Sequence, residues 1–518
     1  MTTPPFKESI TLEQWRAWAQ EGFTRLPVVL TRHEESLPEN WSEFTSAPAT
    51  VLLESAQSGR YTYLCDRPAR IVMGHATLAE IWSAEGGTLL ETKLGKPLEV
   101  LSALLAERKA PALAGGPAMQ GGIMGIFGYD LVRTWERLPF RATRDLRLPL
   151  YALIETGELF IYDHDERTLR VVVWSEVTAN AELISDQFRR AQAAVARAGT
   201  RWGSVAAGER AASRAVDATS SFQKDGSPSR PSDDAATAGT ISPSFTSVDF
   251  QSAARRVLDY IGAGDTYQVN LSRRTSRATG LPPAAIYEAL RKLNPSPYMG
   301  LLRLPQFALV CGSPELLVSL VNGVVRSRPI AGTRPRGDAA LADAHFSADL
   351  FASEKERAEH LMLVDLIRND IGRVAAFGSV KVPEFMVLER YSHVMHLVSQ
   401  VEGRLAAGKT WVDVFQSMFP GGTITGCPKF RTMEIIEELE PVGRGFYTGA
   451  LGWISYGGEM ELNIVIRSML VQDGIAHVQA GSGIVADSKP DRELDEATRK
   501  AQALWVALEN AAERHGKR

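Results

Sequence analysis

The chain has 518 residues, of which 44% are hydrophobic and 23% charged; this composition is typical of soluble globular proteins, and the length exceeds one ordinary domain. The formal net charge of -4 and the lack of a dense basic run argue against nucleic-acid binding. The three scattered cysteines match no zinc spacing, and we find no secretory signal and no apolar span of about twenty residues, so we expect a reduced, cytoplasmic protein.

Residues 1–204 mix strand-like and helix-like segments. The stretches "ELFIYDHD" and "RVVVWSEV" predict two strands joined by a turn near Asp163–Glu166. Residues 205–245 are rich in Ala, Ser, Asp and Pro and nearly lack large apolar side chains, so we interpret them as a flexible surface linker. We therefore divide the chain into an N-terminal lobe, this linker and a C-terminal lobe at residues 246–518.

The C-terminal lobe alternates less regularly between helices and strands. "SVDFQSAARRVLDYIGAGD" and "SEKERAEHLMLVDLIRNDIGRVA" have helical periodicity, and "TYQVNLSRRTS" alternates as a strand does. A hairpin of long strands is predicted around "NIVIRSML" and "HVQAGSG", followed by a terminal helix that begins near Pro490. Because the order is not a regular βαβ repeat, the pattern favours an α+β fold built in layers.

The stretch "GGTITGCPK" at residues 421–429 resembles a phosphate-binding loop only superficially. Gly421 and Gly426 have the right separation, but Pro428 has no N–H to donate and Lys429 comes too late. We therefore interpret the loop as a turn or as the wall of a site for a different ligand.

Two helices carry paired carboxylates. Glu356 and Glu359 are three residues apart and share a helix face, and Glu493 and Glu496 repeat this spacing on the terminal helix. Together the two faces would offer the oxygen ligands that Mg²⁺ prefers. The spacing alone also fits two solvated faces with ion pairs such as Glu496–Lys500.

Two further features suggest a site for an anion, and a third suggests a proton donor. Arg467 interrupts the apolar "NIVIRSML", where it needs either an anionic partner or an edge position in water. Gly481 and Gly483 follow the next strand and would present N–H groups to an anion or form a turn. Glu315 lies among apolar residues, which would raise its pKa and suit a general acid, unless its carboxylate is satisfied structurally.

The ordered motifs identify a resemblance to the chorismate-utilising enzymes. "GDTYQVNLSRR", "GSPELL", "RPIAGTRPRG", "EKERAEHLMLVDLIRND", "FPGGTITGCPK", "IVIRSML" and "QAGSGIVADS" occur in the order seen in that family, and "VLLES" and "GGIMGIFGYDLVR" extend the match into the first lobe. The resemblance implies a sandwich of antiparallel sheets and helices with an N-terminal lobe and a C-terminal catalytic lobe. The resemblance also favours a metal site at the paired glutamates over the alternative that both helix faces are exposed to water.

The resemblance implies roles for particular residues. Mg²⁺ would bridge the ring carboxylate of chorismate to Glu359 and Glu496, with Glu356 and Glu493 assisting. Glu315 would protonate the departing 4-hydroxyl, and His396 would face the ring. The remaining implied residues of the substrate pocket are Arg467, Tyr447, Gly481, Gly483, Thr333, Thr425, Gly426, Lys500, Ala331 and Gly332.

A second pocket is implied in the first lobe. Glu54 and Ser55 of "LLES", with Pro297, Tyr298 and Met299 of "NPSPYM", resemble the tryptophan site of the family. The pocket would hold tryptophan either as a regulator or as a structural element, or it would be no more than part of the core.

Gln268 indicates which branch of the family is resembled. The water-adding members have a Lys at the matching position as a general base, and a Gln cannot deprotonate water. This favours the ammonia-using members, which receive ammonia from a glutamine amidotransferase subunit. "QVNLS" and "FPGGTITG" favour aminodeoxychorismate synthase component I, which forms 4-amino-4-deoxychorismate, whereas "PIAGTRPRG", "LLES" and "NPSPYM" resemble anthranilate synthase component I.

Ala331 and the possibility of a non-catalytic role leave two alternatives open. Some aminodeoxychorismate synthases have a Lys at the position of Ala331 that is proposed as a covalent nucleophile, so its absence here puts the covalent route in doubt. A catalytically silent protein that binds tryptophan or chorismate is the alternative from another functional class, because a fold does not fix a function. The intact acidic quartet argues against that alternative.

Overall fold

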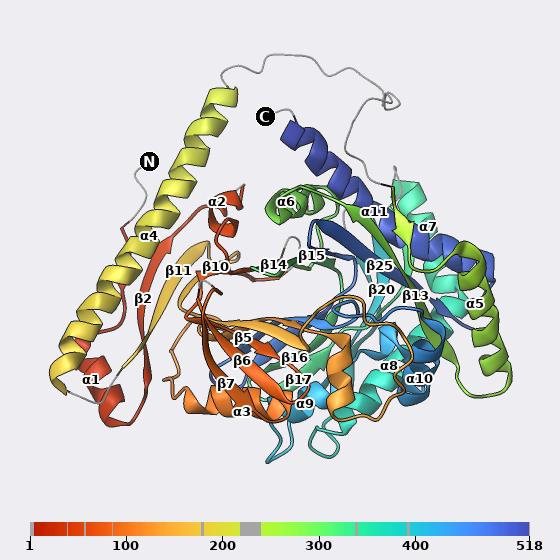
Figure 1. Cartoon of the computed structure of the whole chain (residues 1–518), viewed down its shortest axis with the longest axis horizontal. Helices are drawn as coiled ribbons and strands as arrows, with labels where there is room; N and C mark the ends of the chain where they lie inside the picture. Colours follow the sequence, from red (N-terminus) through yellow and green to blue (C-terminus); the bar gives the residue numbers. More distant parts are fainter. Residues whose placement is uncertain are drawn as a thin grey trace.

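The computed structural model describes residues 5–38, 40–55, 59–84, 86–177, 181–217, 240–336, 340–390 and 394–516. Within these ranges the strands form two antiparallel sheets (Figure 1). The first sheet has the order β1 (Lys7–Glu8), β2 (Arg25–His33), β11 (Thr168–Glu176), β10 (Glu158–Asp163), β4 (Tyr61–Arg67), β3 (Thr50–Glu54), β14 (Tyr298–Leu304), β15 (Phe307–Ser313), β24 (Ser468–Gln472), β25 (Ile475–Ile484), β13 (Gln268–Ala278) and β12 (Ser242–Pro243), with β21 (Gly426–Cys427) on β13.

The second sheet is also drawn from both ends of the sequence. Its order is β18 (Ile330–Pro335), β20 (Val394–Arg404), β17 (Val324–Ser327), β16 (Leu316–Val321), β23 (Met460–Ile464), β22 (Ala450–Ser455), β8 (Gly122–Phe127), β9 (Tyr151–Glu155), β5 (Arg70–Gly74), β6 (Leu78–Ser83) and β7 (Leu89–Leu94), with β19 (Lys381–Arg390) on β20. The helices and 3-10 turns are α1 (Leu12–Gln20), α2 (Ser42–Thr45), α3 (Pro97–Glu107), η1 (Tyr129–Thr134), α4 (Ala181–Asp217), α5 (Ser247–Gly262), α6 (Pro283–Leu293), α7 (Ala340–Ala352), α8 (Glu354–Gly372), α9 (Trp411–Met418), η2 (Gly422–Ile424), α10 (Lys429–Leu439) and α11 (Pro490–Gly516).

Strand alternation assigns side chains to the two faces of the second sheet. In β8, Met124 and Ile126 enter the core between the sheets, whereas Ile123 and Phe127 enter a second core on the outer face. A strand places successive side chains on opposite faces, so a strand buried on both sides reads as a continuous apolar run such as "GIMGIF". The expected layered α+β sandwich is confirmed.

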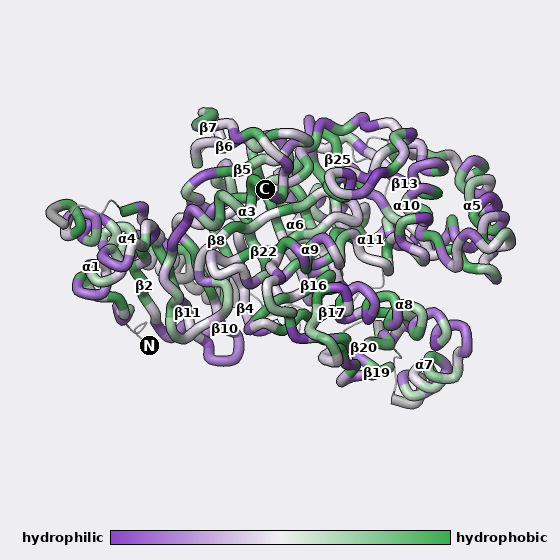
Figure 2. The backbone as a smooth tube through the Cα atoms, turned by 90° about the horizontal axis from the view of Figure 1, so that it is seen from below, coloured by the Kyte–Doolittle hydropathy of each residue, from purple (hydrophilic) through white to green (hydrophobic). Residues whose placement is uncertain are grey.

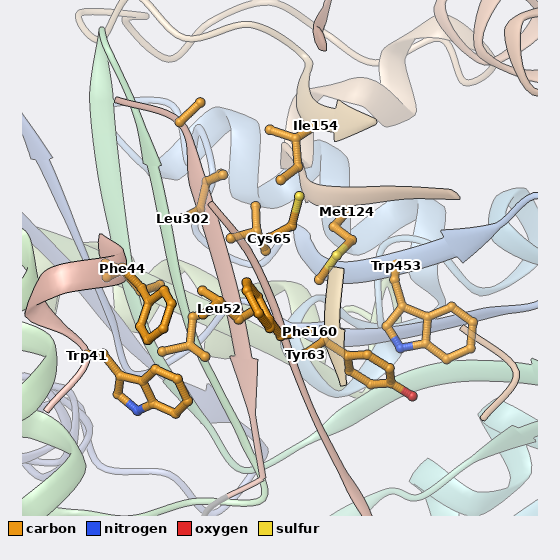
Figure 3. Close-up of a cluster of buried hydrophobic side chains, with 14 of the residues drawn as sticks. Trp41, Phe44, Leu52, Tyr63, Cys65, Met124, Ile154, Phe160, Leu302 and Trp453 are labelled. Carbon is orange, nitrogen blue, oxygen red and sulfur yellow. The ribbon is translucent and has the colours of Figure 1, made fainter. Parts of the chain in front are cut away.

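Aromatic side chains fill the core of the first half (Figure 3). Trp202 of α4 packs against Phe160 of β10 with ring centroids 5.2 Å apart, and against Trp41 at 6.0 Å. These contacts dock α4 along β2 and β11 at one end of the molecule, while α5 and α10 lie at the opposite end (Figures 1 and 2).

The structure corrects two expectations about organisation. The linker was predicted to begin at residue 205, but α4 continues to Asp217, and Ser242–Pro243 pair with β13. Ala-rich sequence supports a helix as readily as a linker, which explains the error; residues 218–239 lie outside the described part. The two lobes of the sequence also share both sheets, because β3 pairs with β14 and β8 pairs with β22.

Among the described residues, no helix is long and apolar enough to cross a membrane. The three cysteines are free thiols, and Cys65 and Cys311 are buried. This agrees with the reduced state expected from their number and spacing.

A buried carboxylate joins the two halves of the chain. Glu437 of α10 accepts hydrogen bonds from the backbone N–H of Ala142 at 2.8 Å and from the Arg144 guanidinium at 2.7 Å, and it also pairs with Arg133. Its side chain is only 5% exposed, so little solvent screens these interactions.

We expect Glu437→Ala to lower the free energy of unfolding by about 2–4 kcal/mol, because Arg133 and Arg144 then share only Asp130 and two backbone N–H groups lose their acceptor. Glu434→Ala removes a half-exposed carboxylate from the same helix and should cost about 1 kcal/mol or less. Urea denaturation followed by circular dichroism measures both; equal effects would show that Glu437 does not hold the halves together.

Candidate active site

Gln268 is the first residue of β13, and its side chain contacts a carboxylate of α8. The Gln268 amide donates to Glu359 Oε1 at 3.2 Å, and Gln268 is only 3% exposed. Burial raises the pKa of Glu359, and the nearby Glu356 and Glu496 raise it further. Helices α8 and α11 therefore bring like charges together, an arrangement that a cation would relieve.

The four predicted metal ligands are not gathered around one point. Glu356 pairs with Arg334 at 3.2 Å, and Glu496 pairs with Lys500 at 2.7 Å. Glu493 is buried, and no group of three His, Cys, Asp or Glu side chains within the described ranges is arranged to hold a metal. The four carboxylates therefore lie in one region, and carboxylate oxygens are ligands that Mg²⁺ prefers. To bind a metal ion, Glu356 would have to leave Arg334 and Glu496 would have to leave Lys500.

Gly481 and Gly483 lie inside β25, which corrects the expectation that they follow a strand. They pair with Ser272 and Asn270 of β13. A Cβ added at Gly483 would lie 2.4 Å from Gln268 Nε2, so only glycine leaves room for that amide. The carbonyl of Gly481 accepts a hydrogen bond from Lys500 Nζ at 3.1 Å, which places Lys500 beside Glu496 and the strand.

Glu315 has the environment expected of a proton donor. It lies between β15 and β16 and is 7% exposed. Burial raises the pKa of Glu315 to about 7, against the opposing effects of Thr423 and Lys500. A carboxyl group with this pKa still holds a proton near neutral pH and is suited to general acid catalysis.

His396 is held in one tautomer by the backbone of a neighbouring strand. Its Nδ1 lies 3.2 Å from the carbonyl oxygen of Gly332, and because a carbonyl only accepts, Nδ1 carries the proton. Burial lowers the pKa of His396, so the neutral ring is favoured. Gly332 has a φ of 64° at a bulge after Ala331; the backbone of Thr333 is described, but its side chain lies outside the described part.

Arg467 lies at the connection between β23 and β24, not within a strand as the sequence suggested. Its φ is 49°, in the left-handed region. Burial lowers the pKa of the guanidinium, and no hydrogen bond or ion pair to it is found among the described residues. Tyr447 lies against Arg444, with the guanidinium 5.6 Å from the ring centroid, and burial raises its pKa.

The loop at residues 421–429 is fastened to β13 and does not form a phosphate site. The Thr425 hydroxyl donates to the carbonyl of Gly421 at 2.9 Å, and Gly426 pairs with Val269. Lys429 donates to Asp370 at 2.6 Å. The lysine that would have reached a phosphate is therefore a structural ion-pair partner.

Sequence reasoning missed the buried pair Arg444–Glu440. The guanidinium donates to Glu440 at 2.7 Å, to the carbonyl of Ile424 at 2.8 Å and to the carbonyl of Asn270 at 2.7 Å. The pair ties the loop to β13. Its only sequence signal was the i,i+4 spacing, which carries little weight outside a helix.

Two buried polar atoms near the site lack a hydrogen-bond partner in the described part of the chain: Gln268 Oε1 and Asn270 Oδ1. Buried polar groups are almost always satisfied, so unpaired ones indicate where a ligand or water binds. Gln268 and Asn270 are two residues apart on β13 and share a face.

The predicted second pocket is present as a cavity of about 560 Å³. All five residues expected there line it: Glu54, Ser55, Pro297, Tyr298 and Met299. The carboxylate of Glu54 is already engaged, because it accepts from Arg291 at 2.6 Å and from the Tyr287 hydroxyl at 2.8 Å. Glu54 thus shapes the pocket and is not an open acceptor for a ligand.

Comparison with known proteins assigns the chain to a family. Residues 50–505 match the chorismate binding enzymes, and the chain belongs to that family. It is 40% identical over 463 residues to aminodeoxychorismate synthase component 1 of Bacillus subtilis (strain 168), covering 89% of this chain and 92% of the relative.

Anthranilate synthases are similarly close. The chain is 42% identical over 475 residues to anthranilate synthase component 1 of Thermus thermophilus, covering 90% of this chain and 93% of the relative. The crystal structure of anthranilate synthase component I from Streptococcus pneumoniae TIGR4 has a TM-score of 0.68 and 30% identity, covering 86% of this chain and 92% of that one. The expected family is confirmed, and the chain is an enzyme that acts on chorismate.

We expect Gly483→Ala to lower turnover by about tenfold or more with the fold retained, because the new methyl group displaces Gln268 from Glu359. Gly457→Ala is the matched control, since its methyl group would meet nothing closer than Ser455 Oγ at 3.7 Å. Steady-state kinetics and thermal unfolding separate the effects; wild-type turnover in Gly483→Ala would show that the Gln268 position is unimportant.

Proposed function

We propose that this chain is the chorismate-aminating component of an aminodeoxychorismate synthase, which forms 4-amino-4-deoxychorismate for 4-aminobenzoate and folate synthesis. The observation that carries the proposal is Gln268, a buried amide that donates to Glu359. The family resemblance places it at the position of the general base of the water-adding members. An amide cannot deprotonate water, whereas ammonia is already a nucleophile.

The unpaired acceptors on β13 support ammonia as the nucleophile. Gln268 Oε1 and Asn270 Oδ1 are buried acceptors that need donors, and ammonia offers three N–H groups. The relatives named component 1 support a second subunit, and we assign to it the glutamine amidotransferase that supplies ammonia.

In the proposed reaction an amino group replaces the 4-hydroxyl of chorismate, and no oxidant or reductant is required. The C–O bond of the 4-hydroxyl breaks, Glu315 gives its proton so that the group leaves as water, and a C–N bond forms to ammonia. The surplus proton on nitrogen then restores Glu315. Arg467 is a half-buried cation for which no side-chain partner is found among the described residues, and we assign it and Tyr447 to a substrate carboxylate.

Glu359 and Glu496 are the residues that we propose to hold Mg²⁺, with Glu356 and Glu493 assisting. Their fit rests on the approach of these carboxylates to one another: burial raises the pKa of Glu359, and the nearby Glu356 and Glu496 raise it further. When bound, Mg²⁺ would neutralise a carboxylate of the dianionic substrate. Lys500 pairs with Glu496 in the structure, and metal binding would displace it from that carboxylate.

Anthranilate formation is the second candidate. It requires a base to take the ring proton when the enolpyruvyl group leaves, and neutral His396, with its proton on Nδ1, presents an unprotonated Nε2. The cavity lined by residues of "LLES" and "NPSPYM", which we propose as a tryptophan pocket, also favours this candidate.

The deciding experiment incubates the purified chain with chorismate, Mg²⁺ and ammonium salt at alkaline pH. We expect a product that yields 4-aminobenzoate only after the separate lyase is added, and no product when EDTA removes Mg²⁺. Fluorescent anthranilate as the main product would establish the second candidate. Binding of chorismate without any product would instead support a catalytically silent protein, and full turnover in EDTA would contradict the metal assignment.

Glu315→Gln should lower kcat by roughly 100-fold or more, because it removes the proton donor while keeping the shape of the side chain. In the wild type the acid form is lost as pH rises through about 7, so kcat at a fixed concentration of free ammonia should fall over that range. The variant should lack this limb of the pH profile. An unchanged profile in Glu315→Gln would assign the proton to another group.

A further inference from the structure

Strand β7 is an open edge of the second sheet. It is the last strand in the order of that sheet, and among the described residues it pairs only with β6. Its sequence is "LLETKL", and Leu90 and Leu94 are 59% and 81% exposed. Figure 2 places β6 and β7 at the margin of the molecule, apart from α8 and α11. An edge strand with exposed leucines and unpaired backbone groups is a surface on which another strand can pair.

The register of β7 on β6 shows which backbone groups face outward. Gly95 donates its N–H to the carbonyl of Thr77 at 2.9 Å, and Leu94 lies opposite Leu78 in the next pair. Antiparallel strands alternate between pairs that exchange hydrogen bonds and pairs that do not. Gly95 belongs to the first kind, so Leu94 and Thr92 belong to the second kind and direct their N–H and C=O groups away from β6.

The residues around Thr92 are arranged symmetrically. Glu91 and Lys93 lie one position on either side of it, and Leu90 and Leu94 lie two positions on either side. In an antiparallel pair of two copies with Thr92 opposite Thr92, each Glu91 faces the Lys93 of the other copy, and each Leu90 faces the other Leu94. Opposite charges and apolar side chains that face each other across strands stabilise the pairing. The strand is therefore complementary to itself.

The charges on β7 select this register over its neighbours. Moving the twofold axis by one residue places Glu91 opposite Glu91 or Lys93 opposite Lys93, and like charges directly opposite each other are destabilising. A lysine on a sheet edge often prevents pairing. Here the Lys93 ammonium lies 2.9 Å from Glu107 and 3.8 Å from Glu91, so its charge is balanced before a second strand arrives.

We propose that β7 pairs with β7 of a second copy of this chain, with the twofold axis at Thr92, so that the second sheets of two molecules join into one. The partner is a second copy because the strand complements itself in both charge and backbone direction. β7 lies at the opposite end of the second sheet from β18 and β20, the strands that carry Gly332 and His396. Dimerisation therefore leaves the proposed reaction site open.

Analytical ultracentrifugation of the full chain over a range of concentrations tests the proposal. The wild type should change from monomer to dimer as the concentration rises. Glu91→Lys and Lys93→Glu should each weaken the dimer by about tenfold or more, because each variant places like charges opposite each other. The double variant that carries both changes should recover much of the lost affinity. Glu99→Lys is the matched control, since Glu99 lies on α3 in an exposed pair with Lys96.

Thr92→Pro gives a second readout. Proline removes the N–H that faces outward and leaves the hydrogen bonds to β6 in place, so it should abolish the dimer while the chain stays folded. Thermal unfolding measured at low concentration should show that each variant is folded. A wild type that stays monomeric at every concentration, or a dimer that all of these variants leave intact, would overturn the proposal. Neither result bears on the product formed from chorismate, so failure here is distinct from failure of the proposed function.

Discussion

The reaction site depends on the buried ion pair between Arg444 and Glu440. The two side chains are only 1% and 3% exposed, and the guanidinium also binds carbonyl groups of the loop and of β13. Glu440 Oε1 also accepts hydrogen bonds from the backbone N–H and the hydroxyl of Ser272, which adds a second link between the pair and β13. Losing either partner would leave a buried charge uncompensated, at a cost of about 3–5 kcal/mol. The position of Gln268 follows from this pair, since Gln268 begins the strand that the pair anchors.

Two acidic side chains show the same physical effect in different surroundings. Burial raises the pKa of both Glu315 and Glu461 to about 7. Glu315 has Lys500 and Thr423 nearby and lies next to unpaired polar atoms, which suits a group that gives and regains a proton. Glu461 lines the 560 Å³ cavity beside Tyr63 and Trp453, and no side-chain partner for it is found among the described residues. The neighbours, and not the acidity, distinguish the two side chains.

Local sequence patterns predicted the elements and several side-chain environments, because they depend on neighbours along the chain. The apolar surroundings of Glu315 were visible in "CGSPELLVSL", and the helical spacing of the glutamates on α8 was visible as i,i+3 pairs. Gly481 and Gly483 were misplaced because glycine usually marks a turn, whereas here it leaves space for a side chain from the paired strand. Pairing between β3 and β14, or between β8 and β22, joins residues far apart in sequence, so no local pattern carries it.

The wall of the 560 Å³ cavity and residues of the proposed reaction site share short stretches of backbone. Pro314 and Leu316 line the 560 Å³ cavity, and Glu315 lies between them in the chain. Strand β18 gives a second example. Ile330 lines that cavity, and two residues further along the strand the carbonyl of Gly332 orients His396. A close-packed interior transmits displacement, so a change in this part of the cavity wall would shift the backbone on either side of Glu315 and the carbonyl that orients His396.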